Sequence, residues 1–304
     1  MPDPQAYLNG KFVPAAQAVV PAFDAGFVQG TTVAEQLRTF GGRLFRLEMH
    51  IERLFRSLAI VDVDPGHSFE QLAEVAHELV AHNHPLLADG DDLGLAMFVT
   101  PGEYPAMISG QPSGATVCLH TFPLRFELWA DKYQHGESLA TTDVEQVPPG
   151  CWPPELKCRS RLHYYLADRE ARRRYPGSRA LMLDHQGCVI EATSANVVLY
   201  RGDVGLLLPP AEKTLPGISL AVLLELAEEL EVDYAQRDLK TADAAEAHEV
   251  LLTSTALCIV PVVAINGRPI GSGHPGPMFA RFMSAWNELV GLDIVEQAQR
   301  FAIR

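Results

Sequence analysis

The chain has 304 residues, 47% of them hydrophobic and 20% charged, and a formal net charge of −14. This length allows two domains with a sizeable core, and the acidic balance argues against nucleic acid as a partner. The five cysteines form no CxxC pair, so neither a zinc site nor a disulfide framework is expected. The start MPDPQAYLNG resembles no secretion signal, and no stretch reaches the roughly 20 apolar residues of a membrane span. We therefore expect a cytoplasmic protein.

The first part of the chain mixes strand and helix patterns. An Asn9–Gly10 turn predicts a hairpin, and Gly41–Gly42 joins two further strands. Helical spacing predicts two helices, in LEMHIERLFRSLAIV and FEQLAEVAHELVAHNHP, and two strands follow in LGLAMFVT and GATVCLHTF. Residues 123–136 have no clean period and suit an extended linker. They separate an N-terminal α/β domain over residues 1–122 from a second domain over residues 137–304.

The second domain has its own sequence of elements. A helix is predicted from about Arg159 to Arg174, followed by strands in RALMLDH and CVIEATSANVVLY. A tight turn then leads into a helix in TLPGISLAVLLELAEEL, a strand spans EVLLTSTALCIVPVVAING, and GPMFARFMSAWNELV is the last helix expected. This mixture predicts an α+β fold in two domains.

Lys157 is the first candidate for chemistry. Only five of the 24 basic residues are lysines, and this one lies just before Arg159 and Arg161. Neighbouring cations and an apolar wall disfavour the ammonium form, which makes a lysine amine nucleophilic. The alternative is an exposed lysine at a helix start.

A Schiff-base cofactor such as pyridoxal phosphate needs further partners, and the chain offers a candidate for each. Glu191 is an acid within an apolar strand, suited to a pyridine nitrogen. The Pro-Gly turn before Ile218 and Ser219 places their amides at a helix N-terminus, where an anion is favoured. Further phosphate candidates are the hydroxyls of Ser254 and Thr255 and the guanidinium of Arg53. Each also has an ordinary structural explanation, such as a capped helix or a surface arginine.

These segments, in this order, resemble the class IV aminotransferases, which are pyridoxal-phosphate enzymes of fold type IV. The group includes branched-chain and D-amino-acid aminotransferases, R-selective amine transaminases and aminodeoxychorismate lyases. The resemblance runs from YLNGKFV through LKCRSRLHYYLADREA, IEATSANVVLY, LPGIS and TSTALCIVPVVAINGRPIG to GHPGP. It implies a two-domain α+β fold like that of D-amino-acid aminotransferase, with the cofactor at the domain interface, and a homodimer whose partner loops cover the site.

The resemblance also implies residue roles. Lys157 is similar to the lysine that binds the cofactor and moves the proton, and Glu191 to the acid on the pyridine nitrogen. Arg53 is similar to the phosphate-binding arginine. The remaining matches are Asn196, which follows that acid, Leu215 under the ring, the backbone pair Ile218 and Ser219, and the hydroxyl of Thr255 at the phosphate.

Two departures from the family pattern concern the cofactor and the substrate. Arg161 stands where many relatives carry tyrosine and where the lyase branch carries arginine, and a contact with the cofactor's phenolic oxygen is the role it suggests. No arginine occurs between Arg56 and Arg125, where relatives hold the substrate carboxylate. Arg38 is the replacement candidate, and its alternative is a solvent-facing strand residue.

The sequence thus predicts a transaminase that exchanges an amino group between an amino acid or amine and a 2-keto acid. The nearest alternative is an aminodeoxychorismate-lyase-type enzyme that releases pyruvate, which Arg161 favours. A non-catalytic relative is the third possibility, and the joint presence of Lys157, Glu191 and Arg53 argues against it.

Overall fold

The computed structural model describes residues 3–303; Met1, Pro2 and Arg304, which the predicted domains include, lie outside the described residues. The chain divides into two compact units. Unit 1 comprises residues 1–124 together with 156–160, and unit 2 comprises residues 125–155 together with 161–304. Both contain helices and sheets, as the predicted α+β class requires. The division at residues 123–136 into two functional domains stays a prediction.

Unit 1 is built on a six-stranded antiparallel sheet with the order β2-β1-β6-β5-β3-β4. Its strands are β1 (Gln5–Leu8), β2 (Lys11–Pro14), β3 (Val33–Phe40), β4 (Arg43–Leu44), β5 (Leu93–Thr100) and β6 (Thr116–Pro123). Its helices are α1 (Ala25–Val28), α2 (Leu47–Ile60) and α3 (Phe69–Asn83), with short 3-10 turns η1 (Ala15–Gln17), η2 (His84–Leu86) and η3 (Pro105–Met107). These bounds confirm the two predicted hairpins, the two helices and the strands β5 and β6.

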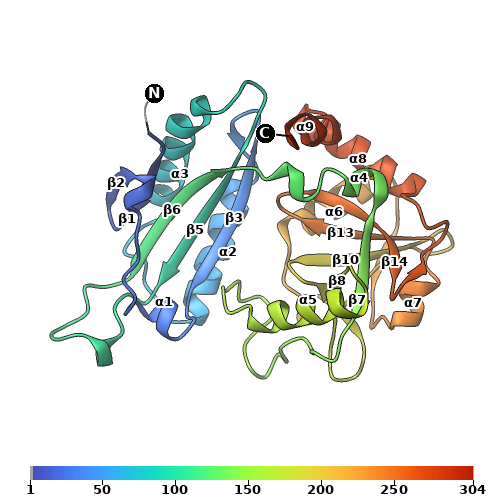
Figure 1. Cartoon of the computed structure of the whole chain (residues 1–304), viewed down its shortest axis with the longest axis horizontal. Coiled ribbons are helices and arrows are strands. Elements are labelled where there is room, and N and C mark those ends of the chain that lie inside the picture. Colours follow the sequence, from blue (N-terminus) through green and yellow to red (C-terminus); the bar gives the residue numbers. More distant parts are fainter. Residues whose placement is uncertain (1–2, 304) are drawn as a thin grey trace. The chain divides into compact units, whose positions relative to one another are not determined.

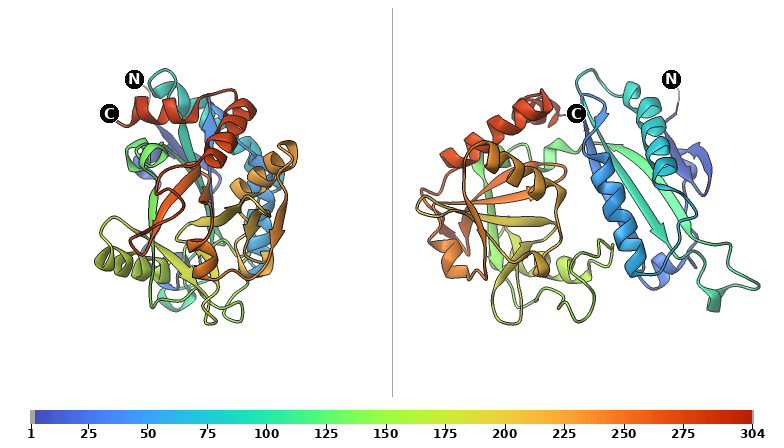
Figure 2. Two further views of the ribbon diagram at one scale, coloured as in Figure 1. Left: turned by 90° about the vertical axis from the view of Figure 1, so that its right-hand side faces the viewer. Right: turned by 180° about the vertical axis from the view of Figure 1, so that it is seen from behind.

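The core of unit 1 lies between the sheet and its two long helices, which cover one face (Figures 1 and 2). On β3, Val33 and Leu37 point into this core, and α2 contributes Ile51, Leu54 and Leu58. Alternation along a strand sends every second side chain to the helix-covered face. Glu35 shares that alternation, so a carboxylate also points toward α2.

Unit 2 contains a nine-stranded sheet in which six strands close into a ring. The strands β10, β13, β14, β7, β8 and β9 pair in this order, and β9 returns to β10. Their bounds are β7 (Glu137–Thr141), β8 (Arg179–Leu183), β9 (Val189–Ala192), β10 (Ala195–Arg201), β13 (Glu249–Ser254) and β14 (Cys258–Ile265), and β11 (Gly205–Leu208), β12 (Tyr234–Gln236) and β15 (Arg268–Pro269) extend the sheet. Closure pairs every strand of the ring on both sides and encloses an apolar core.

Unit 2 also contains helices and 3-10 turns. They are α4 (Lys132–His135), α5 (Leu162–Arg174), α6 (Ile218–Glu229), α7 (Thr241–Ala245), α8 (Pro277–Val290) and α9 (Ile294–Phe301), with 3-10 turns η4 (Phe126–Leu128) and η5 (Ala211–Lys213). Helix α5 packs on β7 and β8, and α6 packs on β13. Both helices therefore cover the outward-facing side chains of strands whose other side chains fill the core. Within residues 3–303, none of the helices has the length and apolar character needed to span a bilayer.

Four sequence-based expectations need correction. The segment 123–136 is not extended throughout, because it contains η4 and α4. The helix expected from Arg159 begins at Leu162, because residues 157–159 pair with the start of β3 instead. The single strands expected in 188–200 and 249–267 are each two strands joined by a tight turn. A further helix, α9, follows the predicted last helix.

Candidate active site

The segment that carries Lys157 belongs to unit 1 and is held between β3 and α2. The amide of Ala34 donates to the carbonyl oxygen of Lys157 at 3.0 Å, and the amide of Arg159 donates to the carbonyl of Thr32 at 2.8 Å. On the other side, the amide of Lys157 donates to Oγ of Ser57 at 3.1 Å. Lys157 is half-buried. Hydrogen bonds to β3 and to a side chain of α2 hold its backbone in place.

Arg53 lies on the same face of α2 as Ser57, one turn earlier, and is 2% exposed. Its Nε and Nη2 donate to the two carboxylate oxygens of Glu35 at 2.7 and 2.8 Å. His50, also on α2, contacts Oε2 of Glu35 through Nδ1 at 2.8 Å. Arg53 is thus a buried, bidentately paired cation and not the surface side chain that a helix arginine usually is.

The electrostatics of this cluster follow from its burial. Burial opposes the ionisation of Glu35, but its bonds and charge interaction with Arg53, with smaller contributions from His50 and Lys157, hold the pKa of this carboxyl at about 2. Burial also lowers the pKa of His50 below its usual range, although Glu35 opposes this shift. The cluster at neutral pH therefore consists of a carboxylate, a guanidinium and a neutral imidazole, with Lys157 close enough to interact with both Glu35 and His50.

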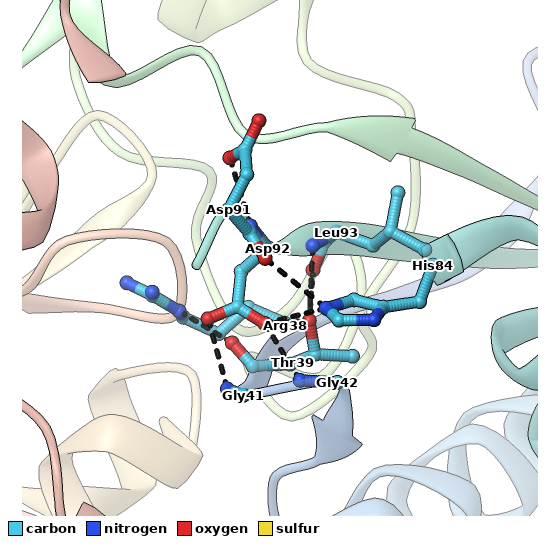
Figure 3. Close-up of polar contacts among 8 residues, drawn as sticks. All are labelled: Arg38, Thr39, Gly41, Gly42, His84, Asp91, Asp92 and Leu93. Carbon is cyan, nitrogen blue, oxygen red and sulfur yellow. Dashed lines mark hydrogen bonds and ion pairs between the residues drawn. The ribbon is translucent and has the colours of Figure 1, made fainter. Parts of the chain in front are cut away.

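Arg38, the predicted substrate residue, is buried and not solvent-facing, with 1% of its side chain exposed. Its Nε donates to the carbonyl of Thr39 at 3.1 Å, and its guanidinium carbon lies 4.1 Å from the centre of the Phe40 ring. Figure 3 shows this arginine beside the turn between β3 and β4. A cation stacked on an aromatic face is stabilised by the electron density of the ring.

That turn is anchored by Asp92, a fully buried carboxylate at the start of β5. Asp92 accepts hydrogen bonds from the hydroxyl of Thr39 at 2.5 Å and from the amides of Gly41 and Gly42 at 3.0 Å each (Figure 3). Both glycines have positive φ, as a tight two-residue hairpin turn requires. The strand end that carries Arg38 is therefore fixed by a neighbouring strand.

In unit 2, strand register places three polar side chains in one row on the outer face of the ring. Glu191 pairs with Asn196, and Asn196 pairs with Thr253. Directly opposed residues of antiparallel strands point to the same face. All three are buried, with exposed fractions of 4%, 7% and 2%.

Glu191 accepts hydrogen bonds at Oε1 from the Tyr164 hydroxyl on α5 and from Nε2 of Gln146, the latter at 2.6 Å. Burial raises the pKa of this carboxyl above its usual range, and the bonds from Tyr164, Gln146 and the backbone of Leu215 oppose the rise. Burial and the neighbouring Glu191 raise the pKa of Tyr164 well above its usual range. Tyr164 therefore stays a hydrogen-bond donor at any working pH.

The N-terminus of α6 lies next to this row. Its N-cap residue is Gly217, and no side chain of a described residue caps the helix. Nδ2 of Asn196 donates to the carbonyl of Leu215 at 2.9 Å, and a Cβ built at Gly217 would lie only 2.0 Å from Oδ1 of Asn196. The free amides at Ile218 and Ser219 and the helix dipole make this a suitable anion site.

Thr253 is a second feature that suits an anion at this position. Its hydroxyl oxygen is buried and has no hydrogen-bond partner among the described residues. Helix α6 packs on its strand, and its pairing partner Asn196 contacts the turn just before α6. A buried hydroxyl without a hydrogen bond lowers the stability of the folded state by about 1–3 kcal/mol, so a bound group that hydrogen-bonds to it would be stabilised there. The phosphate of pyridoxal phosphate fits an uncapped helix N-terminus lined by such a group.

The other predicted residues of unit 2 are more open. Ser254 ends β13, and Thr255 lies in the turn before β14, both half-buried. Arg161 is exposed just before α5, and its Nη1 lies 3.4 Å from the Ser194 hydroxyl. Unit 1 thus holds Lys157, Arg53 and Arg38, whereas the rest of the predicted set belongs to unit 2: Glu191, Asn196, Leu215, Ile218, Ser219, Ser254, Thr255 and Arg161.

Sequence reasoning missed Glu35, His50, Ser57, Tyr164 and Thr253. An acid within a largely apolar strand, here VAEQL, is the same signal that singled out Glu191, so Glu35 could have been found. The other four become visible only through their contacts, because a helix face or a strand register decides which residues meet them.

Comparison with known proteins gives consistent matches. The family model described as amino-transferase class IV matches residues 19–265. The D-alanine aminotransferase of Bacillus licheniformis is 30% identical over 279 residues, covering 91% of this chain and 94% of that protein. A putative branched-chain-amino-acid aminotransferase of Methanocaldococcus jannaschii is 29% identical, covering 93% and 95%.

Solved structures match over the whole fold. A branched-chain amino acid aminotransferase solved with pyridoxamine 5′-phosphate superimposes with a TM-score of 0.85 at 25% identity, covering 95% of each chain. The Escherichia coli branched-chain enzyme reaches a TM-score of 0.87 at 24% identity with the same coverage. These matches confirm the predicted fold type, and because all of them are aminotransferases, the lyase alternative is not favoured.

Proposed function

Because the chain belongs to the class IV aminotransferase family and is a pyridoxal-phosphate-dependent aminotransferase, we propose that Lys157 is the residue that carries the cofactor. The observation that supports this choice is the docking of its backbone on Ser57, one turn along α2 from Arg53. The lysine of this segment is thereby fixed beside a buried guanidinium. As in the family, the substrates are an amino acid and a keto acid.

When bound, pyridoxal phosphate supplies an aldehyde that links to amines and a ring that takes up an electron pair. Nζ of Lys157 would hold the cofactor at its aldehyde carbon, and the same amine would act as the base that moves the proton at the substrate Cα. The guanidinium of Arg53 and the amides of Ile218 and Ser219 bind the phosphate, with the hydroxyls of Ser254 and Thr255 as further ligands.

Glu191 holds the proton at the pyridine nitrogen in this proposal. The hydroxyl of Tyr164 and the amide of Gln146 orient its carboxylate through Oε1. Leu215 would support the ring, Asn196 fixes the backbone at Leu215, and Arg161 would hold the phenolic oxygen. A Glu191→Gln variant keeps the hydrogen-bonding shape and loses the charge, so proton abstraction is expected to slow while cofactor affinity changes little. Equal single-turnover rates in both proteins would remove this role.

Lys157→Ala tests the central assignment. The wild-type protein loaded with pyridoxal phosphate is expected to show the visible absorption band of a lysine-linked cofactor and to lose it on addition of an amino donor. The variant is expected to lack both the band and turnover. Lys11→Ala, which removes an exposed lysine on β2, serves as the matched control. An unchanged band in Lys157→Ala would refute the assignment.

Arg38 is proposed as the group that binds the substrate carboxylate. Support comes from its burial, its stacking on Phe40, and the lack of any arginine between Arg56 and Arg125 in the sequence. Arg38→Met keeps much of the apolar stem and removes the charge. A panel of L-amino acids, D-amino acids and simple amines should then show a selective loss for the carboxylate-bearing donors. An equal loss for amines would mean that Arg38 only supports the fold.

A homodimer and a cytoplasmic location complete the proposal. Large apolar side chains are exposed around α1 and η3, among them Phe23, Phe27 and Met107, at 38%, 77% and 58%. A second copy of the chain would cover such a surface. Sedimentation of the wild-type protein and of Phe27→Glu tests this, because a dimer that buries Phe27 should dissociate in the variant. Cell fractionation tests the location.

A further inference from the structure

Four buried or half-buried groups meet on one face of α2 in unit 1. His50, Arg53 and Ser57 follow each other at intervals of three and four residues, so they share a helix face. Glu35 reaches this face from β3, and the backbone of Lys157 docks on Ser57. The face therefore joins an acid, a guanidinium and an imidazole to the segment of the nucleophile.

Glu35 uses both of its oxygens on Arg53. The bonds from Nε at 2.7 Å and Nη2 at 2.8 Å form a planar fork, and the bond from His50 at 2.8 Å fixes the carboxylate from a third direction. Strand β5 places only the apolar Met97 opposite Glu35. Because the Glu35 carboxylate is held in this way, the Arg53 guanidinium is restricted to one orientation.

The same pair controls the local charge. Burying a guanidinium without a counter-ion is strongly unfavourable, and the attraction to Glu35 offsets part of that cost. A guanidinium alone would also repel the protonated amine of Lys157, whereas the carboxylate attracts it. Glu35 interacts with Lys157 as well as with Arg53. Its negative charge therefore acts on two groups that the proposed function uses.

We propose that Glu35 is a positioning residue that orients Arg53 toward the cofactor phosphate and offsets the charge of Arg53 beside Lys157. The proposal rests on the proposed function, since it assigns Arg53 to the phosphate and Lys157 to the aldehyde. Glu35 touches neither substrate nor cofactor in this role. It acts through the direction of one side chain and the ionisation of another, and these two effects can be separated.

Glu35→Gln and Glu35→Asp separate them. The Gln variant removes the charge and one acceptor oxygen, so pyridoxal phosphate affinity should fall about tenfold or more. The pKa of the lysine–cofactor link, read from the visible band during a pH titration, should fall by about one unit because an attractive anion is lost. The Asp variant keeps the charge but is one methylene shorter. Its affinity should fall while the pKa of the link stays near the wild-type value.

Asp24→Asn is the matched control. Asp24 is an equally buried carboxylate of unit 1, but its oxygens accept from the hydroxyls of Thr100 and Thr116 at 2.9 and 2.7 Å. This variant should lower the melting temperature of the apo-protein without changing the affinity or the pKa of the link. A shift of both quantities by the same amount in Asp24→Asn and Glu35→Gln would reduce Glu35 to a general stability role.

The outcomes distinguish the inference from the function beneath it. If the wild-type protein shows no lysine-linked band, the proposed function fails. If the band is present and Glu35→Gln keeps the wild-type affinity and pKa, only the positioning role is overturned. If the Gln variant does not fold, Glu35→Asp decides: reduced affinity with an unchanged pKa supports the role, and unchanged affinity overturns it.

Discussion

Replacement of Gly217 by alanine should distort the proposed anion site, because the new methyl group would clash with Asn196. The new Cβ would lie 2.0 Å from Oδ1 and 3.1 Å from Cγ of Asn196, closer than such atoms can approach. Backbone strain is not the cause, because φ of Gly217 is −69°. Asn196 must move, so its 2.9 Å bond to the carbonyl of Leu215 is lost. Losing this bond and leaving a carbonyl unpaired costs about 1–3 kcal/mol.

The cost should appear in two measurements. Denaturant unfolding of the apo-protein should show the loss of stability, and titration with pyridoxal phosphate should show an affinity about 5- to 100-fold weaker, because the amides of Ile218 and Ser219 follow directly. Gly150→Ala is the control, since a Cβ there meets no atom within 4 Å. In an Asn196→Ala background the second substitution should cost little, because the clashing side chain is gone. Wild-type affinity in Gly217→Ala, or full additivity in the double variant, would refute the reasoning.

Two other predictions follow from buried groups. Thr253→Val removes a buried hydroxyl that has no hydrogen-bond partner among the described residues and keeps the shape of the side chain. Unfolding curves should show that the apo-protein is as stable or more stable by about 1 kcal/mol. Titration should show weaker binding of pyridoxal phosphate, and unchanged affinity would contradict the prediction. Glu35 has a folded pKa of about 2 against an ordinary 4.5. Its stabilisation is therefore complete above pH 4.5 and is lost as the pH falls toward 2, by about 3 kcal/mol in total. Urea unfolding of the apo-protein at several pH values should show a steeper loss there for wild type than for Glu35→Gln, and parallel curves would count against the ion pair.

Regular elements with clear periods were predictable, and tight turns without glycine or proline were not. The sequence CVIEATSANVVLY has strand-forming residues throughout, but the chain reverses at Ser194, which adopts a φ of 63°. The turn between β13 and β14 has the same feature, because Cys258, which follows Thr255 in this turn, adopts a φ of 58°. A non-glycine residue in this region gives no local signal, because the sheet pairing on both sides stabilises it.

The start of α5 shows the same limit for helices. Residues before Leu162 have a helix-compatible composition, but the amide of Ala34 and the hydroxyl of Ser57 bind the backbone at Lys157 in an extended segment. Tertiary hydrogen bonds decide the boundary, and the sequence of the segment does not contain them. The sequence allowed candidate residues to be named by type, and their roles stay predictions. The pairing of Glu35 with Arg53 and the row of Glu191, Asn196 and Thr253 required the register of strands and the face of a helix.

The buried ion pair of Arg53 and Glu35 limits how Arg53 can act on a phosphate. Glu35 already neutralises its guanidinium, so the pair adds little net charge to attract a phosphate. In the proposed phosphate-binding role, Arg53 would contribute directional hydrogen bonding from a guanidinium whose orientation the carboxylate sets. Lysine could not replace it, because a single ammonium cannot bridge both oxygens of Glu35 and present a donor in a defined direction. The amides at the start of α6 are likewise directional and carry no full charge. Phosphate binding should accordingly depend more on geometry, as altered by Glu35→Asp or Gly217→Ala, than on ionic strength.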